Sequence, residues 1–378
     1  MQNKMIKVGF NKPYIAKGTL DAVSRVLKSG SLEGGGRMTE YCHQWFHDNY
    51  FGTRALLVNS CTAALEMSVI LADIGPGDEV LIPSSTFVST ANAVVLRGGV
   101  PIFCDISPDT LNITEFEILQ KITNKTKAVI IVHYAGVHCE TERIKILLDK
   151  RKIALIEDAA QAIGSYENKK PVGTIGDYGC ISFHATKNIN SGEGGILLIK
   201  DEESYNRANI AWEKGTNRKD FVDGKIDKYS WVGIGSSYLP SEMTAAIIYQ
   251  QLQQLDYVTN SRKDICFYYF NNITRKTNIS FRTISIESLK KGNAHIFYLI
   301  FEQKVDSIKF CSYLQAHGVD VRRHYQSLHQ SQFYKKNYPH CELPVTEYIV
   351  PRLVRLPVWI GVNKKYVIKI INEFFEKN

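Results

Sequence analysis

Two side chains in the middle of the chain, Lys187 and Asp158, supply the groups that chemistry with pyridoxal 5'-phosphate requires. A lysine amine condenses with a carbonyl to form a Schiff base, and a carboxylate keeps the pyridine nitrogen of the cofactor protonated. Lys187 lies within residues 182–188 and is followed by a glycine-rich turn at residues 192–195, whereas Asp158 lies within residues 157–161. The pair therefore predicts a pyridoxal phosphate site.

Each member of this pair also has a plain structural interpretation. An aspartate directly after a strand often caps a loop or a helix, but Gln161 can turn toward the same crevice and hydrogen-bond the phenolic oxygen of the cofactor. Most lysines are solvated surface charges, yet Lys187 stands between an apolar strand and glycines that let a ligand approach closely. His184 either packs in the core or supports proton transfer, and we favour the supporting role.

A second group of residues is suited to the phosphate and the ring of the cofactor. Ser60, Cys61 and Thr62 follow a buried run and open a helix, so free amide groups and hydroxyls there can hold a phosphate. Ser182 adds a further hydroxyl, and Phe87 is the aromatic residue placed to stack on the pyridine ring. The alternatives, a helix cap without ligand and a core aromatic residue, stay open from the sequence.

The elements that must position these residues alternate along the first half of the chain. Short apolar runs fit strands buried on both faces, at residues 55–58, 80–82, 100–103, 128–132, 153–156, 181–183 and 196–199. Segments with helical spacing that begin with threonine lie between them, at residues 62–72, 86–96 and 141–150. The alternation predicts an α/β fold with a mainly parallel sheet, whose ligands bind at the carboxyl ends of the strands.

The chain is long enough for two domains. A helical stretch at residues 251–255 leads to a strand-like segment at residues 293–298. We expect a large cofactor-binding domain over residues 1–250 and a smaller C-terminal α+β domain over residues 251–378. In the second part, His324 and His329 either line the substrate site or face solvent, and Arg218 leaves the same alternatives open.

Composition and charge exclude several classes of function. No apolar run approaches the ~20 residues that span a bilayer, and residues 1–8 lack the apolar core of a signal peptide, so we expect a cytoplasmic protein that binds no membrane. The net charge of +8 comes from lysines and arginines mixed with acids, which argues against nucleic acid and suits an anionic small substrate. The 8 cysteines show no CxxC spacing, and the pair His133 and His138 lacks further ligands, so we expect no metal.

Several motifs in order resemble the DegT/DnrJ/EryC1/StrS nucleotide-sugar aminotransferases. The motifs are residues 60–65, 157–161, 182–188 and 192–195, and the likeness runs from about residue 10 to the end. A narrower branch, the transaminases that make dTDP-4-amino-4,6-dideoxygalactose for enterobacterial common antigen, is similar over residues 83–92, 133–137, 213–218 and 227–231. Two positions depart from many relatives, which have Gly at Cys61 and Asn near Ser237.

The resemblance implies an aspartate-aminotransferase-like, type I fold and a homodimer with its sites at the subunit interface. It implies transfer of an amino group from L-glutamate to a dTDP-4-keto-6-deoxyhexose. By likeness, Lys187 carries the cofactor, Asp158 pairs with the pyridine nitrogen and Gln161 meets the phenolic oxygen. The remaining implied contacts are to the ring and the phosphate, from Phe87, Thr62, Ser182 and, across the dimer, Ser237.

Other functions on this scaffold stay possible from the sequence. A sugar dehydratase of the same fold is disfavoured because those relatives replace the lysine with histidine, whereas Lys187 is retained. A non-catalytic protein that binds the cofactor or a nucleotide sugar is disfavoured by the intact set of Lys187, Asp158 and Gln161. An aminotransferase that gives the gluco epimer or a 3-amino sugar is a third alternative, because stereochemistry depends on how the sugar lies in the pocket.

Overall fold

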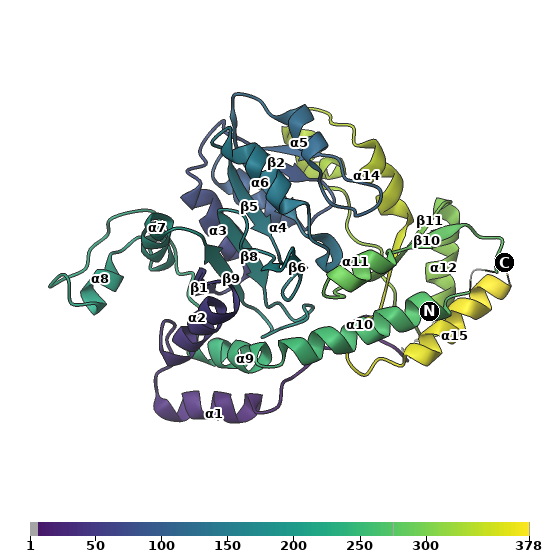
Figure 1. Ribbon diagram of the computed structural model, residues 1–378, viewed down its shortest axis with the longest axis horizontal. Helices are drawn as coiled ribbons and strands as arrows, with labels where there is room; N and C mark the ends of the chain where they lie inside the picture. Colours follow the sequence, from purple (N-terminus) through teal and green to yellow (C-terminus); the bar gives the residue numbers. More distant parts are fainter. Residues whose placement is uncertain (1–6, 275, 378) are drawn as a thin grey trace.

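A seven-stranded sheet forms the centre of the computed structural model, which describes residues 7–274 and 276–377 (Figure 1). The strand order is β1-β9-β8-β5-β4-β2-β3. Strand β9 runs in the opposite direction to the other strands of this sheet. The bounds are β1 (Arg54–Val58), β2 (Glu79–Pro83), β3 (Val100–Cys104), β4 (Thr126–Val132), β5 (Ala154–Asp158), β8 (Tyr178–Ser182) and β9 (Gly195–Ile199). The predicted α/β fold with a mainly parallel sheet is confirmed.

Helices cover both faces of the sheet, because alternate side chains of each strand point to opposite faces. In β1, Leu56 and Val58 pack with α3, α4 and α7, whereas Ala55 and Leu57 pack with α2 and α9 on the other face. Leu155 of β5 packs with α5 and α6. The bounds are α2 (Arg37–Asn49), α3 (Cys61–Leu71), α4 (Val88–Leu96), α5 (Glu115–Lys121), α6 (Thr141–Asp149), α7 (Glu202–Trp212) and α9 (Glu242–Leu252).

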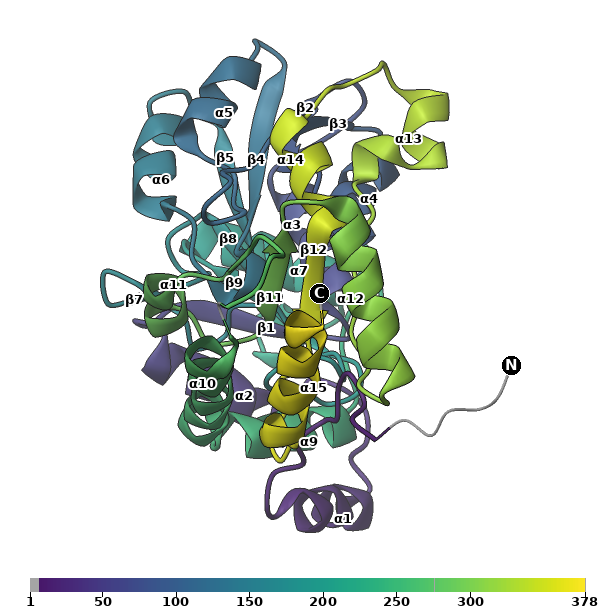
Figure 2. The same ribbon diagram turned by 90° about the vertical axis from the view of Figure 1, so that its right-hand side faces the viewer.

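The last part of the chain builds a second, antiparallel sheet in the order β10-β11-β12. Helices α10, α12 and α15 surround it (Figure 2). Its core also takes in Leu111 and Tyr134 from the first part. The predicted division at residue 250 stays a prediction, and its outer ends, residues 1–6 and 378, lie outside the described residues. The bounds are α10 (Leu255–Asn272), β10 (Phe281–Thr283), α11 (Ile286–Lys291), β11 (Phe297–Phe301), α12 (Lys304–Ala316), α13 (Gln332–Asn337), α14 (Pro344–Ile349), β12 (Leu353–Leu356) and α15 (Lys364–Glu376).

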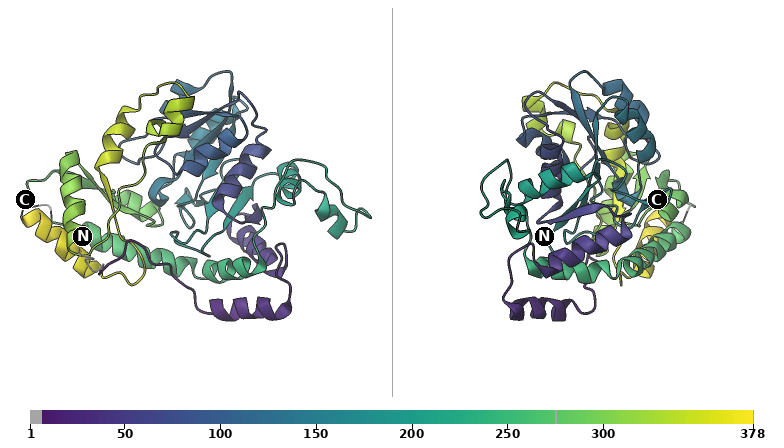
Figure 3. Two further views of the ribbon diagram at one scale, coloured as in Figure 1. Left: turned by 180° about the vertical axis from the view of Figure 1, so that it is seen from behind. Right: turned by 60° about the vertical axis from the view of Figure 1, so that its left-hand side comes forward.

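Two segments extend from this body. Helix α1 (Thr19–Ser29) packs on α9, and an arm formed by residues 213–237 carries α8 (Arg218–Val222) away from the sheet (Figures 1 and 3). Within the described part of the chain, no helix has both the length and the hydropathy of a membrane span. Of residues 1–8, which lack the apolar core of a signal peptide, residues 1–6 lie outside the described residues. The shortest elements are the hairpin β6 (Tyr166–Glu167) with β7 (Lys170–Pro171), and the 3-10 turns η1 (Tyr134–Gly136), η2 (Leu328–Gln330) and η3 (Val350–Arg352).

The side chain of Glu157 fixes the end of β5. It is fully buried and accepts hydrogen bonds from the amides of Gly173, Ile175 and Gly176 at 2.6 to 2.8 Å. His133 Nε2 lies 2.9 Å from the same carboxylate, while His133 Nδ1 accepts the amide of Cys139, so the imidazole is neutral and donates from Nε2. Burial raises the pKa of Glu157, but these donors outweigh it and hold the pKa below its usual value. The carboxylate therefore ties β5, the loop after β4 and the turn before β8 together.

Candidate active site

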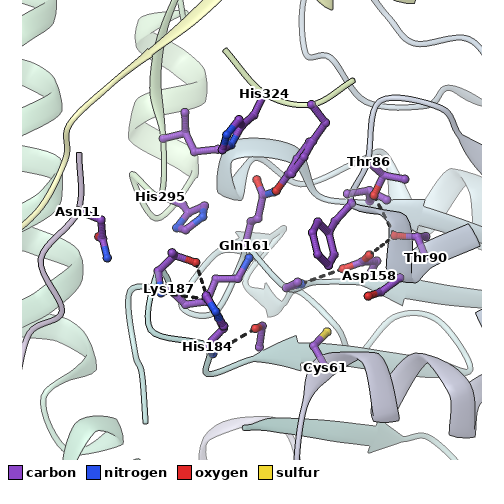
Figure 4. Close-up of a pocket in the computed structure, with 18 of the residues that line it drawn as sticks. Asn11, Cys61, Thr86, Thr90, Asp158, Gln161, His184, Lys187, His295 and His324 are labelled. Atoms are coloured by element: carbon purple, nitrogen blue, oxygen red, sulfur yellow. Dashed lines mark hydrogen bonds between the residues drawn. The ribbon is translucent and has the colours of Figure 1, made fainter. Parts of the chain in front are cut away.

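A cavity with a volume of about 520 Å³ lies at the carboxyl ends of the large sheet, and residues of the second sheet close its other side (Figure 4). Because β1, β2, β4, β5 and β8 run in the same direction, the segments that follow them meet at one edge. All of the predicted site residues except Ser237 line this cavity: Ser60, Cys61, Thr62, Phe87, Asp158, Gln161, Ser182, His184 and Lys187. Their roles toward a cofactor stay predictions.

Asp158 is a buried carboxylate that two hydrogen bonds hold in place. Its Oδ2 accepts the hydroxyl of Thr90 at 2.8 Å, and its Oδ1 accepts the amide of Ala160 at 3.2 Å. No ion pair joins it to any of the described lysines, arginines or histidines. Burial raises the pKa of Asp158, and the bonds from Thr90 and Ala160 lower it only in part. A buried acid of this kind is matched by a protonated pyridine nitrogen, which supplies the missing positive charge.

Lys187 stands in the turn after β8. Its amide donates to the carbonyl of His184 at 2.8 Å, and Asn11 donates to the carbonyl of Ala185 at 3.1 Å, so the N-terminal segment holds this turn in place. The next residue, Asn188, donates to the carbonyl of Asn293 at 3.0 Å. Lys187 is therefore presented to the cavity by a backbone that both sheets anchor (Figure 4).

The start of α3 provides the candidate phosphate site. The hydroxyl of Ser60 accepts the amide of Ala63 at 3.1 Å, which makes it the helix cap that the sequence left as the alternative. The amides of Cys61 and Thr62 have no acceptor among the described residues, and the dipole of the helix favours an anion there. Gly195 passes so close that a Cβ atom would lie 2.5 Å from the amide nitrogen of Cys61.

The neighbours of these amides complete the cradle. The hydroxyl of Thr62 lies 2.7 Å from that of Ser89, and Ser182 accepts the amide of His184 at 3.3 Å. Burial raises the pKa of the Cys61 thiol well above its usual value, so this thiol is neutral and offers no negative charge against a phosphate. Two hydroxyls, two free amides and no opposing carboxylate fit a phosphate group.

Phe87 and Gln161 face the same space from opposite directions. Phe87 caps α4 with 56% of its surface exposed, so a ring face is open to a planar ligand. Gln161 Oε1 accepts the amide of Ala135 at 2.7 Å, which orients Nε2 toward the cavity, 3.3 Å from the hydroxyl of Tyr325. The ring centroids of Phe87 and Tyr325 are 6.0 Å apart. Ring stacking and a hydrogen bond to the phenolic oxygen are both compatible with this placement.

His184 lies at the rim of the cavity. Its Nδ1 accepts the amide of Thr186 at 3.2 Å, which leaves the proton on Nε2, 3.6 Å from a carboxylate oxygen of Glu193. Its side chain is 45% exposed. The imidazole is thus held by the turn that carries Lys187. A proton-transfer role stays a prediction.

Ser237 does not reach the cavity of its own chain. Its carbonyl accepts the side-chain amide of Asn59 at 3.1 Å, at the base of the arm. The two histidines of the C-terminal part that were candidates for the substrate site lie in different places. His324 lines the cavity, whereas His329 is buried between Ser84 and Glu347. His329 is a packing residue, because the hydroxyl of Ser84 is 2.7 Å from Nδ1 and fully buried.

Sequence reasoning missed several residues of the cavity wall. Thr90 lies within residues 83–92, which form part of the resemblance to the narrower branch. It is the third residue of α4, and this position near the start of the helix could have suggested its hydrogen bond to Asp158. Tyr325, His295 and Arg355 come from the second sheet and its loops, where no local motif marks them. Burial lowers the pKa of His295 well below its usual value, so it is neutral, with Nδ1 2.9 Å from Asn188 Oδ1.

Comparison with known proteins shows the family and the fold of the chain. A model of the DegT/DnrJ/EryC1/StrS aminotransferase family matches residues 13–375. An uncharacterized protein of Methanocaldococcus jannaschii is 31% identical over 380 residues, which cover 97% of each chain. The aminotransferase TlmJ of Streptoalloteichus hindustanus superimposes with a TM-score of 0.89 at 27% identity, covering 98% of this chain and 99% of that one. PseC of Helicobacter pylori, an aminotransferase of pseudaminic acid biosynthesis, gives 0.89 at 25% identity, covering 98% and 100%.

Replacement of Thr90 by valine tests how Asp158 is kept charged. The variant loses a hydrogen bond that lowers the pKa of Asp158, so this pKa rises. Because the carboxylate is lost as pH falls through its pKa, the acid limb of the kcat/KM profile for amino transfer should move to higher pH. Activity at neutral pH should fall about tenfold, the effect of one lost hydrogen bond to a charged group.

The matched control for this prediction is Asn92→Ala, because Asn92 is exposed on the same helix. Its pH profile should coincide with that of the wild type. An unshifted acid limb in the Thr90 variant would show that Asp158 does not titrate in the measured reaction.

Proposed function

Because the chain belongs to the DegT/DnrJ/EryC1/StrS aminotransferase family, we propose that it transfers the amino group of L-glutamate to dTDP-4-keto-6-deoxy-D-glucose. The product is then dTDP-4-amino-4,6-dideoxy-D-galactose, a precursor for a cell-surface polysaccharide such as enterobacterial common antigen or O-antigen. The chain is a sugar aminotransferase that depends on pyridoxal 5'-phosphate. The proposal concerns the identity of the donor, the sugar and the product.

The observation that supports this choice is the position of the segments that resemble the branch that makes dTDP-4-amino-4,6-dideoxygalactose. Residues 83–92 supply Phe87 and Thr90 to the cavity wall. Residues 133–137 orient Gln161 through the amide of Ala135. Two of the four segments of the resemblance therefore contribute to the cavity wall or orient a residue of it, whereas residues 213–218 and 227–231 lie in the arm.

The residues of the chain have separate tasks in this reaction. Bound pyridoxal phosphate supplies the sink for the electrons released at the carbon that loses a proton. Lys187 Nζ holds the cofactor covalently between turnovers and, once freed, takes the proton from the α carbon of glutamate. Asp158 keeps a proton on the pyridine nitrogen, and Thr90 keeps Asp158 in place. Gln161 Nε2, which donates to the hydroxyl of Tyr325 here, would donate to the phenolic oxygen of the bound cofactor.

The partner that we propose is a second copy of this chain. The arm formed by residues 213–237 exposes several apolar side chains, and Trp231 is 83% exposed. Exposed apolar surface of this kind marks a contact with another protein. The base of the arm holds Ser237 beside Asn59, one residue before the candidate phosphate site. The other exposed apolar residues of the arm are Phe221, Val222, Tyr229, Val232 and Ile234.

Trp231→Glu tests the proposed dimer. The wild type should elute and scatter light as a particle of two chains, and the variant should shift to one chain at micromolar concentration, because a charge is placed in an apolar contact. Phe116→Glu is the matched control, since Phe116 is exposed on α5, away from the arm. A wild type that runs as a single chain would contradict the dimer.

Lys187→Ala tests the covalent role of this lysine. The variant should show no turnover with glutamate, no absorbance at about 410 to 430 nm, and no label after borohydride reduction and peptide mapping. Lys200→Ala, at an exposed position after β9, should behave as the wild type. Near-normal amino transfer by the Lys187 variant would overturn the assignment. A wild-type absorbance that glutamate does not bleach would instead indicate a binding protein.

Product analysis tests the identity of the sugar. Incubation of the holoenzyme with dTDP-4-keto-6-deoxyglucose and L-glutamate should give a 4-amino product with the galacto configuration, assigned by NMR coupling constants. The matched reaction uses the 3-keto isomer, which should be converted poorly. The gluco epimer, or a preferred 3-amino product, would rule out the galacto assignment and leave the aminotransferase function intact.

A further inference from the structure

A second cavity, with a volume of about 380 Å³, lies between α10, α11 and the loop that leads into β6 (Figure 1). It shares no lining residue with the cavity at Lys187 among the described residues. Its volume falls in the range of sites for small molecules, roughly 300–1,000 Å³. Polar side chains dominate its wall, whereas cavities that stay empty are apolar. The wall therefore has the composition of a binding site for a polar ligand.

Three lysines supply positive charge to this cavity. Lys263 lies on α10, and Lys290 and Lys291 form the end of α11. Lys263 Nζ donates to the carbonyl of Lys290 at 2.9 Å, so the amine on the first helix is fixed against the end of the second. Burial lowers the pKa of Lys263, because its charged form loses hydration there. None of the described carboxylates forms an ion pair with any of the three amines. Their charges therefore remain available to an anion that enters the cavity.

Thr259 adds a buried hydroxyl that lacks a partner. Only 8% of its surface is exposed, and its Oγ1 has no hydrogen-bond partner among the described residues. A Cβ atom on Gly164 would lie 3.3 Å from this oxygen, so the hydroxyl faces another residue of the cavity wall. An unpaired buried hydroxyl destabilises the fold. Rotation about its χ1 bond, for which a threonine in a helix has two common rotamers, turns the oxygen toward a ligand.

One face of α10 aligns these groups. Residues 256, 259, 260 and 263 follow the spacing of one helix face, and all four line the cavity. The rise of the helix separates Asp256 from Lys263 by about 10 Å. Tyr166 lies at the acidic end, because burial and the charge of Asp256 together raise the pKa of its hydroxyl. The lysines gather at the other end, since Lys263 binds the carbonyl of Lys290. The cavity therefore has an aromatic, acidic end and a basic end.

The two ends suit different parts of one ligand. Tyr166 is 47% exposed, which leaves a ring face open to a planar base, and stacking on an aromatic ring accepts any base. Asp256 accepts hydrogen bonds from hydroxyl or amino groups, and the side-chain amide of Asn260 both donates and accepts. At the basic end, ammonium groups bind phosphate oxygens. A nucleoside phosphate carries its base and its phosphate at opposite ends, which matches the arrangement of the cavity.

Asn293 fixes the two walls of the cavity relative to each other. Its side-chain amide donates to the carbonyls of Gln161 and Ile163, each at 2.8 Å. Ile163 directly precedes Gly164, and Asn293 lies two residues after Lys291. The cavity is therefore built before a ligand arrives, which lowers the entropy that binding must overcome.

We propose that this second cavity binds a nucleoside 5'-phosphate, with the phosphate at the three lysines and the base at Tyr166. The inference goes beyond the proposed function, because none of these residues lines the cavity in which amino transfer takes place. It also does not depend on which sugar the protein aminates.

The first test measures nucleotide binding to the pyridoxal phosphate-loaded protein. ADP and dTDP are each titrated by calorimetry into the wild type and the double variant Lys290→Glu/Lys291→Glu. One site per chain should be weakened at least about 30-fold in the variant, because two attractive charges become repulsive. The matched control, Lys335→Glu/Lys336→Glu, makes the same charge change in an exposed lysine pair at the end of α13 and should bind as the wild type does. Equal affinities of the double variant and the wild type for both nucleotides would overturn the proposal.

Thr259→Val separates binding from a structural role. The variant should bind ADP about threefold to tenfold more weakly, because one hydrogen bond to the ligand is lost. Without nucleotide, it should unfold at the same temperature as the wild type or above it, because valine has nearly the same shape and removes an unpaired buried hydroxyl. A lower unfolding temperature together with unchanged ADP affinity would contradict the proposed contact, because the hydroxyl would then serve the fold alone.

Pyrophosphate tests whether the site reads the nucleoside. The wild type should bind pyrophosphate more weakly than ADP, and Tyr166→Leu should lower the affinity for ADP without changing that for pyrophosphate, since it removes only the stacking ring. Pyrophosphate binding as tight as that of ADP, with both unchanged in Tyr166→Leu, would overturn the nucleoside assignment. If the wild type aminates no dTDP-ketosugar, the proposed function fails, while these titrations still decide the role of the second cavity.

Discussion

The carboxylate of Glu157 is the contact on which the geometry of the site depends. It gathers three backbone amides and the imidazole of His133 in the fully buried interior, where each hydrogen bond is strong and each missing one would be costly. The following residue, Asp158, points into the cavity. The hydrogen bonds of Glu157 thus fix the position of Asp158. Through His133, Glu157 also holds the loop after β4.

The cavity at Lys187 holds buried charges of both signs. Asp158 lies on the side of the large sheet, and Arg355 lies on the side of the small sheet. Burial of each charge destabilises the ligand-free protein, and a bound ligand with complementary charges restores the balance. By family likeness, the protonated pyridine nitrogen of the cofactor is the group that we expect beside Asp158.

The second sheet contributes more than a cover for the cavity. Its loops place Tyr325 against Gln161 and His295 against Asn188, and His329 binds Ser84, the residue after β2. The hydrogen bond between Ser84 and His329 also holds the segment of Phe87, which lies three residues after Ser84. Movement of one sheet against the other would therefore change the ring-stacking position and the contact of Gln161 together.

The sequence by itself determined the seven strands of the large sheet, the helices α3, α4 and α6, and the residues directly after several of these strands. Lys187, Asp158 and Gln161 were predictable because parallel strands end at one edge, so local order along the chain becomes proximity in space. The cap role of Ser60, the bond from Thr90 to Asp158 and the contrast between His324 and His329 were decided only by tertiary structure. The second cavity was likewise beyond local reasoning. Gly164, Lys263 and Lys290 lie far apart in the sequence and meet only because α11 and the loop before β6 pack against α10.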